Sequence, residues 1–114
     1  MGFHSLLHKH GVAWESELAK EINEQVFSFI HNEAHAETEL LAEERGAYLD
    51  GPKSGKRNSH LLAIAPNASS GVILGTSPSI EPLKANAYTH RTRAGSFLVK
   101  NKYLEELLLS LIHI

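Results

Sequence analysis

The sequence predicts an α/β protein with a mostly helical N-terminal half, followed by a strand-turn-helix unit and short strands. Apolar residues recur every three or four positions between Leu18 and Ile30, the period of a helix buried on one face. The run Leu61–Ala65 has the length of a strand and is stopped by Pro66. Further on, β-branched and aromatic residues flank Ala94-Gly95, a pattern typical of two extended segments joined by a turn.

Two helices are predicted in residues 1–46. The first spans Phe3–Lys9 and carries its apolar side chains on one face. The second covers Glu15–Arg45, with acidic residues in its first turns that complement the helix dipole and Gly46 as its C-cap. Residues 47–58 contain two glycines, a proline and several polar residues, and we expect them to form a loop.

The strand-turn-helix unit is predicted in residues 59–82. The strand leads through small or polar residues, Asn67 to Ser70, into a short helix that Gly75 closes. Two prolines four positions apart exclude a regular helix after it. Residues 83–114 are expected to form extended segments and a terminal helix, namely Ala87–Thr92, Ser96–Lys100 and Tyr103–Leu111.

The predicted turn before the short helix suits an anion. A strand, a tight turn and a helix start direct several backbone N–H groups and the positive end of the helix dipole to one place. Asn67, Ser69 and Ser70 add side-chain donors, and the small Ala68 keeps the approach open. The same residues also suit a plain helix cap, in which Asn67 or Ser69 bonds the first free N–H groups. The pattern leaves both interpretations open, and the row of donors tilts it slightly toward binding.

Composition narrows the possible chemistry. The 114 residues contain no cysteine, which excludes disulfides, thiolate catalysis and cysteine-based metal sites within them. No apolar run approaches the roughly 20 residues that cross a bilayer, so we expect a soluble, cytoplasmic protein without a membrane partner. Residues 1–50 hold three basic and ten acidic side chains, whereas residues 51–114 hold eight basic and three acidic ones. This asymmetry favours an anionic ligand in the second part.

The histidines are weaker candidates for a site. His31 and His35 stand four positions apart on a predicted helix, as do His4 and His8, so each pair shares a helix face. No third metal ligand stands at a spacing typical of a metal site. Surface or packing roles are therefore expected, and no metal site.

Two further groups of residues are disfavoured as functional sites. Ser59, His60 and Glu81 could be imagined as a triad, but adjacent residues of a strand point to opposite faces. Arg91 and Arg93 form too small a basic cluster for a nucleic-acid site, and no nucleic-acid partner is expected.

The run from Asn58 to Pro82 resembles the C-terminal barrel region of the large (α, catalytic) subunit of class I ribonucleotide reductase. In that family the pattern is roughly Asn-Ser, an apolar strand, Ala-Pro-Thr-Ala-Ser/Thr, a short helix and Glu-Pro. Here it reads NSHLLAIAPNASSGVILGTSPSIEP. The likeness covers about residues 2–108 and includes Gly2–Leu7, Trp14–Ser16, Asn86–Thr92 and Gly95–Asn101.

The resemblance implies a fragment of the family's ten-stranded α/β barrel. The whole enzyme would be a ribonucleoside-diphosphate reductase, which reduces ribonucleoside diphosphates to deoxyribonucleoside diphosphates for DNA precursor synthesis. The resemblance places the substrate diphosphate on Asn67, Ala68, Ser69 and Ser70, although Asn67 replaces the commoner threonine. The family's catalytic cysteines lie outside the likeness, so we expect no catalytic residue here and an inactive isolated chain.

The resemblance also implies partners. These are the remaining part of the large subunit, a small radical-generating subunit and a thioredoxin- or glutaredoxin-type reductant, with no cofactor in this segment. Leu109–Ile114 no longer resembles the family, which predicts a split gene, an intervening-element junction or a truncated reading frame. The alternative is a stand-alone, non-enzymatic helical interaction or phosphate-binding module. A sharp two-state melt and tight nucleotide binding by the isolated chain would favour that alternative.

Overall fold

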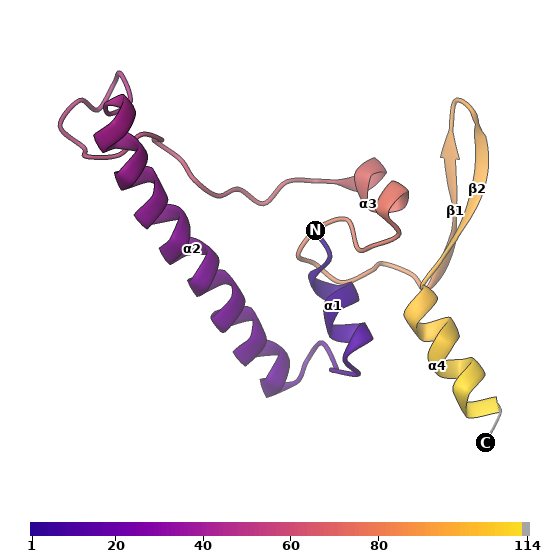
Figure 1. Ribbon diagram of the computed structural model, residues 1–114. Coiled ribbons are helices and arrows are strands. Elements are labelled where there is room, and N and C mark those ends of the chain that lie inside the picture. Colours follow the sequence, from indigo (N-terminus) through magenta and orange to yellow (C-terminus); the bar gives the residue numbers. More distant parts are fainter. Residues whose placement is uncertain (113–114) are drawn as a thin grey trace. The chain divides into compact units, whose positions relative to one another are not determined.

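The computed structural model describes residues 1–112, and Figure 1 shows its elements. The chain divides into two compact units, one formed by residues 1–19 with the chain from Ile64 onward, and the other by Lys20–Ala63. The helices and strands are, in chain order, α1 (Phe3–Lys9), α2 (Glu17–Arg45), α3 (Ala68–Leu74), β1 (Ala87–Thr92), β2 (Gly95–Lys100) and α4 (Lys102–Ile112).

Helix α1 supplies half of the buried hydrophobic residues of the first unit. The buried hydrophobic residues of the described chain are Phe3, Leu7, Val12 and Ala19, all from this unit. The ring of Phe3 meets Trp14 edge-on, with 5.8 Å between the ring centroids. Burying a side chain such as Phe or Leu stabilises a fold by about 1.5–3 kcal/mol, so this small cluster holds α1 in place.

The segment after α3 is tied to α1 by hydrogen bonds. Ser77 is fully buried, and its N–H donates to Ser5 Oγ at 2.9 Å. Its carbonyl oxygen accepts from the N–H of Gly2 at 2.9 Å. These bonds satisfy polar groups that burial would otherwise leave unpaired, and they join residues that are far apart in the sequence.

Helix α3 ends at Gly75, which has the positive φ of 63° that suits a glycine C-cap. Gly71, on the buried side of the helix, packs against the segment that returns over it. A Cβ atom at Gly71 would lie 2.9 Å from Pro78 Cα. Position 71 therefore requires glycine, since any side chain would push the helix and this segment apart.

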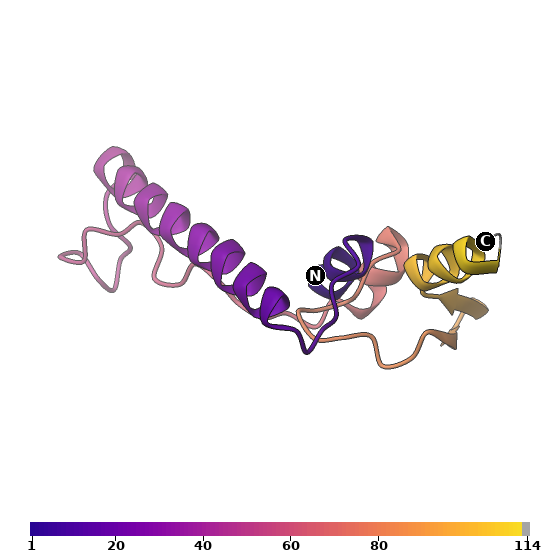
Figure 2. The same ribbon diagram turned by 90° about the horizontal axis from the view of Figure 1, so that it is seen from below.

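The C-terminal part of the first unit is a β-hairpin followed directly by a helix, as Figure 2 shows. Strands β1 and β2 are antiparallel, with Ala87 opposite Lys100. Asn101 connects β2 to α4: its N–H donates to the Asn86 carbonyl oxygen at 2.7 Å, and its Oδ1 accepts from the N–H of Leu104 at 3.4 Å. Asn101 thus fastens the base of the hairpin and caps α4.

The second unit consists of most of α2 and the chain that follows it. Gly46, with φ 79°, ends the helix as predicted, and its N–H donates to the Ala42 carbonyl oxygen at 2.8 Å. Thr38 is buried and holds the returning chain, since its carbonyl oxygen accepts from the N–H of Arg57 and its Oγ1 from the N–H of Asn58, both at 2.9 Å. Within residues 1–112, no helix is long and apolar enough to cross a membrane.

Two predictions about helices and strands are wrong. Helix α2 begins at Glu17 rather than Glu15, because Ser16 caps it and accepts the N–H of Ala19 on Oγ at 3.1 Å. Leu61–Ala65 is not a strand. Strands β1 and β2 pair only with each other, and the described chain offers no further strand to receive the backbone hydrogen bonds of Leu61–Ala65.

Candidate functional site

The predicted phosphate site lies at the N-terminus of α3. Ala68, Ser69 and Ser70 are exposed and form the first turn of the helix. Their backbone N–H groups bond to no other described residue, whereas the N–H of Gly71 donates to the Asn67 carbonyl oxygen at 2.8 Å. Free N–H groups and the two serine hydroxyls therefore gather at the positive end of a helix, an arrangement that suits an anion.

Asn67 does not cap α3 with its side chain. Its Nδ2 donates to the Ala65 carbonyl oxygen at 3.2 Å, and it makes no side-chain bond to the helix. Its backbone N–H donates to the Pro78 carbonyl oxygen at 3.2 Å. The capping interpretation is therefore wrong for Asn67, and the first N–H groups of α3 stay available.

A cavity of about 450 Å³ adjoins this helix end. Asn67 and Ala68 belong to its lining, as do Lys84, Tyr88 and His90. Lys84 contributes a positive charge, and the other two contribute polar groups on aromatic rings. Cavities of this size hold small ligands in other proteins. The structure thus brings Asn67 and Ala68 to the cavity, while Ser69 and Ser70 do not line it.

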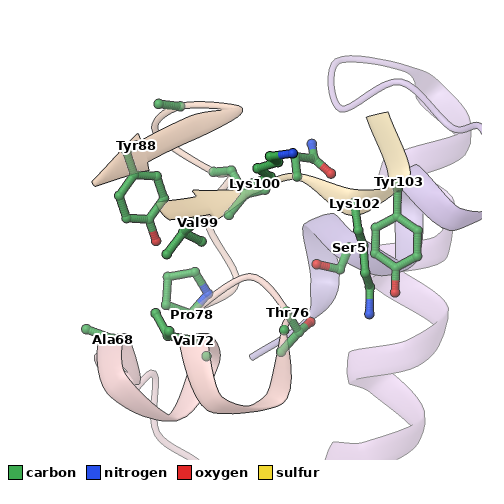
Figure 3. A pocket seen from close by; sticks show the side chains of 15 residues that line it. Ser5, Ala68, Val72, Thr76, Pro78, Tyr88, Val99, Lys100, Lys102 and Tyr103 are labelled. Atoms are coloured by element: carbon green, nitrogen blue, oxygen red, sulfur yellow. The ribbon is translucent and has the colours of Figure 1, made fainter. Parts of the chain in front are cut away.

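A smaller cavity of about 60 Å³ lies between α3 and the hairpin, as Figure 3 shows, and shares Ala68, Val72 and Tyr88 with the larger one. Val72 and Pro78 lie beside Val99 and Tyr88 of the hairpin, so its walls are mainly apolar. No buried side-chain nitrogen or oxygen of the described residues lacks a hydrogen-bond partner. At about 60 Å³ this cavity is much smaller than the first, and Lys100 and Lys102 also belong to its lining.

The histidine pair of α2 lies in the second unit. The rings of His31 and His35 are 4.3 Å apart between centroids and tilted by 47°. With Lys56 and Asn58 they line a groove of about 250 Å³. Across residues 1–112, no group of three or more His, Asp or Glu side chains is placed to hold a metal ion.

Ser59 and His60 come together, contrary to the prediction that they point to opposite faces. Ser59 Oγ lies 3.0 Å from His60 Nδ1, since this segment is not a pleated strand. Both side chains are exposed, and Glu81 belongs to the other unit. Arg91 and Arg93 are exposed on the hairpin.

The sequence did not reveal a buried polar network around α1. His4 is 7% exposed, and its Nδ1 accepts the backbone N–H of Leu83 at 2.8 Å. His8 Nδ1 lies 3.0 Å from Asn101 Nδ2. Burial lowers the pKa of His4 and the nearby His8 lowers it further, while Glu15 acts in the opposite direction. The spacing of the histidines hinted at a pair, but no pattern pointed to partners so distant in the sequence.

Comparison with known proteins assigns this arrangement to a family. The chain matches the family model "Ribonucleotide reductase, barrel domain" over residues 1–51 and 49–112. A Frog virus 3 (isolate Goorha) protein provisionally named ribonucleoside-diphosphate reductase large subunit is 47% identical over 111 residues, which are 97% of this chain and 20% of that protein. The vitamin B12-dependent ribonucleoside-diphosphate reductase of Thermoplasma acidophilum is 39% identical, over 93% of this chain and 15% of that protein.

A solved structure agrees with these sequences. The Actinobacillus ureae class Id ribonucleotide reductase alpha subunit matches with a TM-score of 0.82 and 34% identity, over 96% of this chain and 19% of that chain. The chain thus spans about a fifth or less of the length of these relatives. The predicted α/β barrel fragment is confirmed by the shared fold and the family match. The chain belongs to the ribonucleotide reductase barrel-domain family and corresponds to a fragment of a ribonucleotide reductase large subunit.

Proposed function

We propose that this chain binds the substrate diphosphate within the large subunit of a ribonucleoside-diphosphate reductase. The whole enzyme would reduce ribonucleoside diphosphates to deoxyribonucleoside diphosphates for DNA precursor synthesis. One observation carries the proposal. In the first turn of α3, the backbone N–H groups of Ala68, Ser69 and Ser70 have no hydrogen-bond partner among the described residues, and the chain belongs to the ribonucleotide reductase family.

The chemistry of these groups fits a diphosphate. The three N–H groups and the hydroxyls of Ser69 and Ser70 would donate hydrogen bonds to phosphate oxygens, and such charge-assisted bonds are stronger than neutral ones. Asn67 would add an amide donor beside them, and Lys84 a positive charge in the adjoining cavity. The contribution of these contacts to the reaction is to orient the ribose for groups supplied by other parts of the subunit.

We assign the reacting groups to other parts of the enzyme. The chain has no cysteine, so any thiol chemistry would come from the remaining part of the large subunit. A small subunit would generate the radical, and a thioredoxin- or glutaredoxin-type protein would supply electrons. Relatives named for vitamin B12 dependence and for class Id both match this chain, so we assign the choice of radical generator to other segments. We place the assembled enzyme in the cytoplasm.

The test is the substrate dependence of a reductase assembled from this chain, the remaining large-subunit residues and the small subunit. Replacing both Ser69 and Ser70 by alanine should raise the KM for CDP about tenfold or more, because a hydrogen bond to a charged group contributes about 1.5–3 kcal/mol. The turnover number should change little. Ser96→Ala is the matched control, since Ser96 is an exposed serine on β2. An unchanged KM in the double variant would remove these serines from the phosphate site.

A further inference from the structure

His4 is joined by a hydrogen bond to the wall of the cavity that adjoins the N-terminus of α3. The N–H of Leu83 donates to His4 Nδ1 at 2.8 Å, so Nδ1 is the acceptor and the ring proton of the neutral imidazole sits on Nε2. His4 lies on α1, whereas Leu83 lines the cavity that adjoins the N-terminus of α3. This imidazole nitrogen therefore connects α1 to residue 83 in the wall of the cavity.

The segment that His4 holds has few other restraints. From Ile80 to Ala85, the bond to His4 is the only hydrogen bond that the described residues make. Most of this segment also lines the cavity, from Glu81 to Ala85. Among hydrogen bonds, the one to His4 is therefore the one that holds this segment beside Asn67 and Ala68.

The surroundings of His4 favour its neutral form. The ring of His8 lies 4.0 Å from it between centroids, and Trp14 meets it edge-on at 5.4 Å. Burial lowers the pKa of His4, His8 lowers it further, and Glu15, in the connection to α2, raises it. On the held segment the charged neighbours are Glu81 and Lys84, and both are exposed.

Protonation of His4 would reverse the polarity of this contact. A protonated Nδ1 carries a hydrogen atom and can no longer accept the N–H of Leu83, because two donors would then face each other. His8 has a matching arrangement, with Nδ1 3.0 Å from Asn101 Nδ2. Its bond ties α1 to the start of α4 and does not involve the cavity.

We propose that His4 is a positioning residue of the substrate site: its neutral imidazole latches the 80–85 segment in the position that shapes the cavity beside α3, and proton uptake releases the latch. This inference rests on the proposed function for its effect on substrate, while the latch itself can be measured without substrate.

Two variants separate the effect of the hydrogen-bond acceptor of His4 from the effect of its ring. In His4→Asn, the side-chain oxygen takes the place of Nδ1 as an acceptor but binds no proton in this pH range. In His4→Phe, a ring of similar size remains and the acceptor is lost. His10→Asn is the control, because His10 is an exposed histidine just after the same helix.

The first measurement is the hydrogen-exchange protection of the Leu83 amide in the 114-residue chain, followed by NMR between about pH 5 and 8. In the unmodified chain and in the His10→Asn control, protection should fall about tenfold or more as the His4 ring takes up its proton. It should stay high at every pH in His4→Asn and low at every pH in His4→Phe. Equal protection in the unmodified chain and the phenylalanine variant would overturn the proposal. A changed Trp14 fluorescence spectrum would show that the His4→Phe variant is misfolded. The proposal is then tested by comparing how Leu83 protection depends on pH in the unmodified chain and in His4→Asn.

The second measurement is the KM for CDP of the assembled reductase across the same pH range. We expect the KM of the unmodified chain to rise severalfold at low pH. The rise in KM should be smaller with His4→Asn, whereas kcat should depend on pH in the same way in both. An identical rise in KM for both would overturn the positioning role. Failure of the serine double variant to change KM would instead refute the phosphate site, and the Leu83 result would be unaffected.

Discussion

Replacing Gly71 by alanine tests the packing that sets the start of α3 beside the following segment. The new Cβ atom would lie 2.9 Å from Pro78 Cα and 3.1 Å from the Thr76 carbonyl oxygen, which are backbone atoms that cannot rotate away. Overpacking of this kind costs about 1–3 kcal/mol. Alanine recovers up to about 1 kcal/mol of helix propensity relative to glycine. With the full propensity gain, the net loss of unfolding free energy should therefore be at most about 2 kcal/mol.

The assay is urea unfolding of the chain followed by the fluorescence of Trp14, the single tryptophan, which contacts Phe3 in the first unit. With a urea dependence of about 1 kcal/mol per molar for a small unit, the midpoint should fall by up to about 2 M. Ser70→Ala is the control, since it adds no atoms to an exposed position of the same helix. A midpoint for Gly71→Ala equal to or above that of the unmodified chain would refute the packing argument.

Three further predictions follow from the polar contacts. The stability of the first unit should fall as the pH drops below 6.5, the ordinary pKa of histidine, because burial lowers the pKa of folded His4 and the unfolded chain then binds more protons. A urea midpoint independent of pH in this window would contradict it. Asn101→Ala should cost about 1–3 kcal/mol in the same urea assay, since it removes a buried amide that caps α4; a midpoint like that of the unmodified chain would speak against this. Thr38→Val should speed hydrogen exchange of the Asn58 amide by about tenfold while that of Arg57, bonded to the Thr38 carbonyl, stays slow. Equal changes at both amides, or none, would show that the hydroxyl does not hold this chain.

The elements that depend on local sequence were predictable. The apolar period of α2, the turn at Ala94-Gly95 and the glycine C-cap at Gly75 all correspond to structure at or near the expected residues. The strand prediction for Leu61–Ala65 failed because strand formation depends on neighbouring strands, and the described chain supplies none for this run. An apolar, strand-length sequence with 78% of Ile64 exposed fits a segment whose partners belong to other parts of the barrel.

The site was predictable only in part. Turn chemistry indicated the open N–H groups of α3, because a short helix start after proline with small residues is a local pattern. The contacts of His4 with Leu83 and of Ser5 with Ser77 were not predictable, since they join residues more than 70 positions apart. Neither contact follows a helical or strand period. Tertiary folding alone brings such residues together.

The most direct test of the substrate-binding role is the binding of CDP, measured by calorimetry without turnover. Three samples should be compared: the 114-residue chain, the remaining large-subunit residues, and the two combined. We predict measurable affinity only for the combination, with a loss of about tenfold or more when Ser69 and Ser70 are both alanine. Binding by the 114-residue chain alone, as tight as by the combination, would contradict this role and would support a self-sufficient phosphate-binding module.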